Sequence, residues 1–498
     1  MPFGTSHEII VEATRLCLWS FYKVVAVYGS HNVSPDEPYV IACTHHNMIV
    51  DPAILSNTFP YGRRIHYWAK DSLFANPIAK RILDDSGVVP VDRTTKNNTL
   101  LYAATYDVLA LGECVGVFPE GTSHTLPGIG EFRDGTSWAA LGYAKSLLDA
   151  EGEGAERRTK YQARPADVLP VAIVYQDKSK YRSKIIVQYG KPISVAPYIN
   201  DFINGDQRAT VKRLTRDVEA AVAAMCLNAP DWDSRHAADI SRVLLFGDQS
   251  KDSVDYVPIM QSLISTFSVL VPKYEDIAYL RRILLEYRKQ LNTLHLEDSH
   301  IRNYNEQKIT KTSTTVYLCK QTLKALVDLS IFLPGLLAHW PLYIIAKVTE
   351  RYEIFEEVRA QNKMFVGIAM VPFTYIVMFF LVWRTMFSNS YFGIIPALLT
   401  VGIFAWYHTV SIDSRYEMFK DLRGRWRLFD AVVMGRGMWT RKEKVLEAKR
   451  LRDECLRGVR KMVKDYETQP ELAFILQRLK AKQNEASKKA RKGFEWLS

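Results

Sequence analysis

A histidine and an aspartate five positions apart, His46 and Asp51, have the residue types and spacing that acid–base chemistry needs. They follow the apolar run 39–44, which predicts a strand that ends just before them. A carboxylate can hold one nitrogen of an imidazole while the other nitrogen takes a proton from an alcohol, as general-base catalysis requires. His45 stands one position earlier and is a second candidate for the base.

Three further segments follow this pair in a fixed order: 87–93, which ends in Arg93, 118–123, which contains Phe-Pro-Glu-Gly, and the apolar run 168–173 around Pro170. Together with the segment 46–51 they resemble the signature of the glycerophospholipid acyltransferase family. The resemblance covers roughly residues 10–230. Within the family, the segment 45–52 and the polar run after Gly121 look most like the fungal-type glycerol-3-phosphate/dihydroxyacetone-phosphate O-acyltransferases.

The resemblance implies roles for these residues. The family motif has four residues between histidine and aspartate, which selects His46 as the general base and Asp51 as its orienting carboxylate. Arg93 is the expected phosphate ligand, because a guanidinium matches phosphate oxygens in two-point geometry. The alternative for Arg93 is a surface arginine paired with Asp92.

Glu120 and Gly121 belong to the acceptor-binding segment of the family. Many members continue this segment with Thr-Arg, whereas here Thr122, Ser123 and His124 follow, so one expected cation is missing. Lys70 or Arg133 is left to supply that charge. The residues that we assign to substrate binding are therefore Arg93, Glu120, Gly121, Thr122, Ser123, Lys70 and Pro170, the last of these as part of the acyl channel.

The resemblance implies acyl-CoA as a co-substrate, and we expect no cofactor beyond it. A metal site made by His45, His46 and His66 finds no supporting carboxylate or cysteine arrangement, so we expect no metal. There is no Gly-x-Ser-x-Gly elbow and no phosphate-binding GxxxxGK[ST] loop. These absences disfavour serine hydrolases and nucleotide hydrolases.

Two segments suit the interior of a membrane. Residues 364–383 contain no Asp, Glu, Lys, Arg or His, and of these residue types 391–410 contain only His408. Each segment is long enough to cross a hydrocarbon core of about 30 Å. The apolar segment 325–346 contains two prolines and an aspartate, which favours a re-entrant or interfacial hairpin. Residues 9–28 fit a helix that lies in the interface or packs on its own domain.

The tail, 411–498, carries 23 Lys and Arg against 13 Asp and Glu, which is +10 of the net charge of +11. Because it directly follows an apolar span, attraction to anionic lipid headgroups explains this charge better than a nucleic-acid partner does. Its apolar residues Leu472, Ile475, Leu476 and Leu479 suit a helix that lies on lipid or on another protein.

The remaining pattern predicts an α/β acyltransferase domain, with a mixed sheet covered by helices, followed by a helical region with two C-terminal transmembrane helices. Expected strands are 39–44, 65–69, 87–91, 114–118, 168–175 and 184–189, expected helices include 99–111 and 136–148, and 151–166 is an expected exposed loop. The predicted domains are 1–230, the α/β domain; 231–324, a helical insert; 325–410, the membrane region; and 411–498, the basic helical tail.

The resemblance implies a membrane-bound acyl-CoA:glycerol-3-phosphate 1-O-acyltransferase that makes lysophosphatidic acid, the first step of glycerophospholipid and triacylglycerol synthesis. Dihydroxyacetone phosphate and lysophosphatidate are alternative acceptors, because one phosphate site serves all three. The alternative of another class is a non-catalytic lipid-binding membrane protein on this fold. The expected location is the endoplasmic reticulum membrane, with catalytic domain and tail facing the cytosol, and the oligomeric state stays open.

Overall fold

The computed structural model describes residues 3–92, 98–149, 151–247, 255–302, 311–429 and 440–495, so the predicted phosphate ligand Arg93 lies outside the described residues. The chain divides into two compact units. The first comprises residues 1–226 and 337–405, and the second comprises 227–336 and 406–498. The sequence placed the end of the α/β domain at residue 230 and kept the insert and the tail as separate segments.

A seven-stranded sheet forms the centre of the first unit, and its order is β1-β7-β6-β2-β5-β3-β4. All neighbouring strands are parallel except β6 and β7, which are antiparallel. The strands are β1 (Val24–Tyr28), β2 (Tyr39–Cys43), β3 (Ile65–Lys70), β4 (Val89–Val91), β5 (Cys114–Val117), β6 (Asp167–Tyr175) and β7 (Lys184–Tyr189). The predicted mixed sheet is confirmed.

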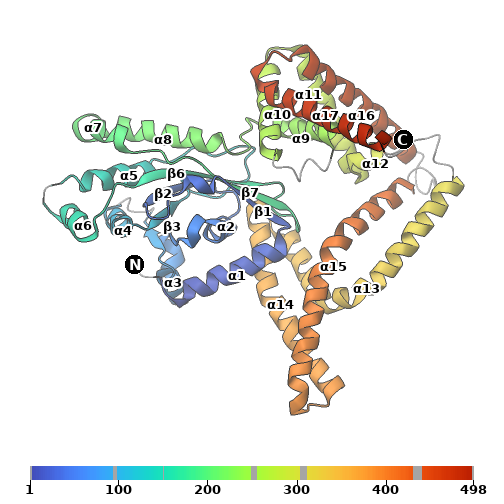
Figure 1. Cartoon of the computed structure of the whole chain (residues 1–498), viewed down its shortest axis with the longest axis horizontal. Helices are drawn as coiled ribbons and strands as arrows, with labels where there is room; N and C mark the ends of the chain where they lie inside the picture. The colour runs from blue at the N-terminus through green and yellow to red at the C-terminus, as the bar shows by residue number, and fades with distance from the viewer. Residues whose placement is uncertain are drawn as a thin grey trace. The chain divides into compact units, whose positions relative to one another are not determined.

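Helices cover both faces of this sheet (Figure 1). They are α1 (Thr5–Phe21), α2 (Val50–Thr58), α3 (Pro77–Asp85), α4 (Thr99–Ala110), α5 (Gly135–Ser146), α6 (Glu153–Tyr161), α7 (Ala196–Asn204) and α8 (Gln207–Ala223). Every residue of β2 is buried, because both of its faces pack against helices. Ile41 and Cys43 join a core with α1 and α2, and Val40 and Ala42 join a second core with α5 and α8.

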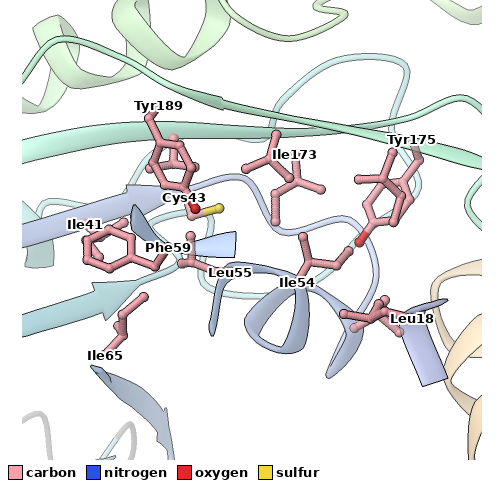
Figure 2. Close-up of a cluster of buried hydrophobic side chains, with 14 of the residues drawn as sticks. Leu18, Ile41, Cys43, Ile54, Leu55, Phe59, Ile65, Ile173, Tyr175 and Tyr189 are labelled. Carbon is pink, nitrogen blue, oxygen red and sulfur yellow. The ribbon is translucent and has the colours of Figure 1, made fainter. Parts of the chain in front are cut away.

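The first of these cores lies under the site described below. Figure 2 shows Leu18 of α1 and Ile54 and Leu55 of α2 beneath Ile173 of β6. Because the side chains of a strand alternate between its faces, each central strand contributes to both cores at once. The core therefore fixes the height of α2 against the sheet, and α2 carries Asp51 in its first turn.

Two local predictions in this unit are wrong. Residues 24–28 form the edge strand β1, whereas the sequence predicted that the first helix would continue to residue 28. This segment is rich in β-branched valine and pairs along its whole length with β7. The predicted loop 151–166 contains helix α6, which is held by ion pairs of the buried Arg157 with Asp107 and Glu153.

The second unit is helical. It contains α9 (Trp232–Phe246), α10 (Tyr256–Leu270), α11 (Glu275–Leu294), α12 (Asp298–Arg302), α16 (Thr440–Asp465) and α17 (Ala473–Glu495). The insert and the tail pack together, α11 against α16 and α10 against α17. Arg452 of the tail pairs with the buried Asp298 of the insert at 2.7 Å.

The sequence predicts that the apolar residues of the tail lie on lipid or on another protein. This prediction is wrong for two of the four residues named, Leu472 and Ile475. Leu472 and Ile475 are completely buried in the second unit. Their partners are the apolar side chains of α10, which the sequence could not assign to the tail because about 200 residues separate the two segments.

Three long helices contain the apolar segments: α13 (Lys311–Tyr352), α14 (Glu356–Phe387) and α15 (Ile394–Phe429). The predicted hairpin at 325–346 is wrong, since these residues lie inside the single helix α13. A proline removes one backbone donor, and a long helix can continue past this local loss. Residues 364–383 and 391–410 lie in helices that are long and apolar enough to cross a membrane, with mean hydropathies of 2.4 and 1.5.

Candidate active site

Asp51 is the centre of the site. Its carboxylate is fully buried at the start of α2, where Oδ2 accepts hydrogen bonds from His45 Nδ1 at 2.9 Å and from the backbone N–H groups of His46 and Asn47 at 2.8 and 2.7 Å. The Tyr175 hydroxyl donates to Oδ1 at 2.5 Å. Burial raises the pKa of Asp51, but the hydrogen bonds from His45, Tyr175 and Asn47 outweigh it, so that the pKa is lowered and the group is ionised.

The predicted pairing of the His46 imidazole with Asp51 is wrong, because the imidazole on Asp51 belongs to His45. Asp51 binds the backbone N–H of His46, and this main-chain contact leaves the His46 ring turned away toward His124, with ring centroids 5.3 Å apart. The His45 ring stacks on Phe118 at 4.3 Å. The structure therefore has the second candidate from the sequence, His45, in the position that the motif spacing assigned to His46.

Glu120, predicted as a substrate ligand, is buried and holds the loop that follows β2. Its Oε1 accepts the backbone N–H of His45 at 2.6 Å, and its Oε2 accepts the N–H of Gly130 at 2.6 Å and a hydrogen bond from His124 Nε2. Burial raises the pKa of Glu120, but these contacts and the nearby His46 outweigh it and leave the pKa below its ordinary value. Glu120 therefore fixes the position of the His45 backbone.

His46, Glu120 and His124 have ligand atoms within 4.8 Å of one another, and among the described residues they form the group that could hold a metal ion. Two histidines and a glutamate are a known ligand set for zinc. The Glu120 carboxylate, however, already accepts three N–H groups, so its oxygens are satisfied by hydrogen bonds alone. His66, the third histidine of the metal site considered from the sequence, lies elsewhere and bonds to Gly87 and Glu113.

His46 predicts a specific pH dependence of stability. Burial lowers its pKa to about 4 from an ordinary value of 6.5, and the carboxylates of Glu120 and Asp51 oppose this only in part. Between pH 6.5 and 4, His46 therefore binds a proton in the unfolded chain but not in the folded chain. The contribution of neutral His46 to the free energy of unfolding is fully present above pH 6.5 and is lost as the pH falls toward 4. Thermal unfolding across this range is expected to show a flatter pH dependence in His46→Gln than in the wild type. Equal slopes would contradict a buried neutral His46.

Lys178 is a residue of the site that the sequence reasoning missed. Its Nζ donates to the backbone carbonyls of His46 and His124 at 3.2 and 3.3 Å and to the Thr125 hydroxyl at 2.5 Å. Lys178 follows β6, and the other two loops follow β2 and β5. Strand β2 lies between β5 and β6 and is parallel to both. The carboxyl ends of parallel strands share one edge of the sheet, which was the available signal for this cluster.

A cavity of about 850 Å³ opens beside His45. Its walls are mostly apolar and include Ile10, Val11, Met48, Leu73, Ile82 and Leu101. Of the predicted binding residues, Lys70, Gly121, Thr122 and Ser123 line it, together with Arg133. His45 also lines it, and within the described part of the chain no hydrogen bond engages its Nε2.

Gly121 and Arg133 are in close contact at the wall of this cavity. Gly121 has a φ of +77°, and a Cβ there would lie 2.6 Å from Nε of Arg133, so glycine leaves the space for this guanidinium. Pro170, predicted as part of the acyl channel, is not among the lining residues. It lies buried in β6 against Gly190, because its position in the strand points to the sheet face opposite α1.

Comparisons with known proteins show which sequences this chain is similar to. A family model described as Acyltransferase matches residues 24–150. Glycerol-3-phosphate O-acyltransferase 2 of Saccharomyces cerevisiae is 23% identical over 341 residues, 65% of this chain and 44% of that protein. Glycerol-3-phosphate O-acyltransferase 1 of the same yeast is 21% identical over 56% of this chain and 37% of its own. A 1-acyl-sn-glycerol-3-phosphate acyltransferase of Bacillus subtilis is 36% identical over 23% of this chain and 56% of its own.

In each case the match spans less than two thirds of the relative. The family model covers β1 to β5 and the loops that carry His45, Asp51 and Glu120. The fold brings these three residues together: His45 lines the cavity, and Asp51 and Glu120 each accept a hydrogen bond from His45. Residues 24–150 therefore match an acyltransferase family model, and the chain is similar to proteins named glycerol-3-phosphate and 1-acyl-sn-glycerol-3-phosphate acyltransferases.

Proposed function

We propose that this chain is a membrane-bound acyl-CoA:glycerol-3-phosphate 1-O-acyltransferase, which forms lysophosphatidate. The observation that carries the proposal is the His45–Asp51 pair at the wall of a mostly apolar cavity that also holds Lys70 and Arg133. The similarity to two yeast proteins named glycerol-3-phosphate O-acyltransferases supports the choice of acceptor.

His45 acts as the general base in this proposal. Its Nδ1–H is donated to Asp51, which fixes the tautomer with a lone pair on Nε2, the nitrogen available to the cavity. Nε2 takes the proton of the acceptor hydroxyl while the oxygen attacks the thioester carbonyl carbon. The acyl–sulfur bond then breaks, the acyl–oxygen bond is formed, and the coenzyme A thiolate receives the proton from the imidazolium. Asp51 stabilises this imidazolium by its charge.

Different parts of the cavity wall suit different parts of the two substrates. The apolar side chains of α1 and α3 suit an acyl chain, since burial of each methylene stabilises the complex by about 0.8 kcal/mol. Lys70 and Arg133 suit the phosphate of the acceptor. Arg133 thereby supplies the cation that the segment after Gly121 lacks.

Replacing Arg133 by alanine is expected to raise the KM for glycerol-3-phosphate roughly 10- to 100-fold, which corresponds to the loss of one or two charge-assisted hydrogen bonds. The KM for acyl-CoA is expected to change little. Arg133→Lys keeps the charge without the two-point geometry and is expected to fall between the two. Steady-state kinetics with each substrate varied in turn measures this. An equal rise in both KM values would argue against a phosphate site at Arg133.

We place α14 and α15 across a bilayer, which is the solvent that their exposed apolar side chains require. In their most apolar windows only 6% and 22% of the residues are buried. Two spans put the connector 384–390 on the far side and leave the catalytic domain and the basic tail on the same side. We assign that side to the cytosol, where acyl-CoA is supplied, and the membrane to the endoplasmic reticulum.

Lysophosphatidate is the second candidate acceptor, and the 36% identity to the Bacillus subtilis enzyme favours it over dihydroxyacetone phosphate. The deciding experiment is an acyl-transfer assay on the purified, detergent-solubilised chain. It uses one labelled acyl-CoA and offers glycerol-3-phosphate, dihydroxyacetone phosphate and lysophosphatidate in parallel. Labelled lysophosphatidate from the first acceptor supports the proposal. No product from any acceptor, with acyl-CoA still bound, would support a non-catalytic lipid-binding protein instead.

A further inference from the structure

The first turns of α14 are part of the catalytic domain. Ala360 is completely buried and Met364 is 8% exposed, and both belong to the same apolar core as Leu18 of α1 and Val50 of α2. α14 also contacts α1, which it crosses (Figure 1). The helix that carries the first predicted span therefore enters the core beneath Asp51 before it continues into its exposed apolar stretch.

Three polar side chains of this segment each bind a different loop of the site. Gln361 Oε1 accepts the backbone N–H of Ile49 at 3.3 Å, in the loop after β2. Glu357 accepts the hydroxyl of Thr125 at 2.7 Å, in the loop after β5. Lys363 donates to the backbone carbonyl of Ser179 at 2.9 Å, in the loop after β6.

These loops are the ones that set the position of His45. Ile49 is the N-cap residue of α2, and it follows Met48, whose φ of +43° is left-handed. A non-glycine residue with positive φ is held there by its surroundings, because the conformation is costly by itself. Ile49 has no side-chain cap of its own, and its backbone N–H is the group that Gln361 binds.

The second loop is connected to the same network. Thr125 accepts a hydrogen bond from Lys178, which in turn holds the backbone carbonyls of His46 and His124. Glu357 binds Thr125 from the other side. A displacement of α14 therefore acts at two points on the loops that carry the His45–Asp51 pair and Glu120.

We propose that Gln361 and Glu357 are positioning residues of the catalytic site, so that the helix predicted to anchor the chain in the membrane also holds the His45 and Glu120 loops. The expected loss of activity rests on the proposed acyltransferase function, whereas the expected loosening of the two loops does not. Separation of α14 from the domain loosens the site itself in addition to removing an anchor.

The test is hydrogen exchange on the full chain in detergent, followed in peptides that cover residues 44–52. Gln361→Leu removes the acceptor for the Ile49 N–H, and Gln361→Glu retains an oxygen acceptor. Asn362→Leu is the matched control on the same helix, since Asn362 binds Glu353 and not the site. We expect faster exchange in Gln361→Leu alone, with protection near wild type in the other two.

Activity gives a second readout. Gln361→Leu is expected to lower kcat about 3- to 10-fold with both KM values unchanged, the size of one ordinary hydrogen bond, and Gln361→Glu is expected to restore it. Wild-type exchange in Gln361→Leu, or equal loosening in Asn362→Leu, would overturn the proposal. Exchange needs no substrate, so loosening without any acyl transfer would reject the proposed function and leave the positioning role intact.

Glu357 provides an independent pair of variants in case Gln361→Leu does not fold. Glu357→Ala removes the acceptor for the Thr125 hydroxyl, whereas Glu357→Gln retains a carbonyl oxygen there. Faster exchange in peptides that cover residues 120–126 is expected for Glu357→Ala only. Identical exchange in the two variants would exclude a role for this contact.

Discussion

Replacing His45 by alanine is expected to lower kcat about 10²- to 10⁴-fold, the usual contribution of a positioned general base. His45 is the imidazole that Asp51 binds, and it lines the cavity. The KM for acyl-CoA is expected to change little, because the apolar wall that would receive the acyl chain is formed by other residues. The measurement is acyl transfer under saturating substrates, with thermal unfolding of each variant as the check on folding.

His46→Ala is the matched control for this prediction, because the two histidines are adjacent. Its ring lies against His124 and Glu120, so its loss is expected to disturb the support of the loop and to lower kcat by no more than about tenfold. If His46→Ala were inactive and His45→Ala retained activity, the four-residue motif spacing would identify the base and the geometry would not. The two variants therefore decide between the family motif and the structure.

Asp51→Asn is expected to lower kcat about 10²-fold or more while the fold is retained. An asparagine can turn its carbonyl oxygen toward the three N–H groups at Oδ2 and its amide toward the Tyr175 hydroxyl, which can accept as well as donate. The geometry is thus kept and only the charge is lost. Because the pKa of Asp51 is lowered, the wild-type carboxylate is charged at neutral pH, and in the proposed mechanism this charge stabilises the imidazolium.

Tyr175→Phe is the companion variant for Asp51→Asn. It removes one of four donors and keeps the charge, so an effect of about 3- to 10-fold on kcat is expected. The measurement is again kcat at saturating substrates, with unfolding midpoints for both variants. If Asp51→Asn and Tyr175→Phe lost the same small amount of activity, Asp51 would act only through loop geometry and its charge would have no catalytic part.

The local features of the fold could be predicted because they depend on residues close in sequence. The run 39–44 is continuously apolar, as a strand covered on both faces must be, and it forms β2. The segments 99–111 and 136–148 have helical character and form α4 and α5. The uncharged segments 364–383 and 391–410 lie in long helices, since only a helix satisfies its backbone within one apolar segment.

The errors fall where distant residues compete for the same segment. Residues 24–28 became a strand because β7, far along the chain, offers a parallel edge to pair with. The tail helix buries Leu472 and Ile475 because α10 presents an apolar face. Pro170 does not line the cavity because side chains alternate along β6, and Val168, two positions earlier in the same strand, belongs to the core opposite α1.

By itself, the sequence determined which segments match the family motif, the α/β character of the first part of the chain, and the two apolar helices. Motif residues, periodicity and apolar content are properties of short segments, so they can be recognised without knowledge of the fold. The tertiary structure alone decided that Asp51 binds the imidazole ring of His45 and not that of His46, and that Lys178 and α14 support their loops. That choice depends on one buried carboxylate, whose contact with the His46 backbone turns the two neighbouring side chains in different directions.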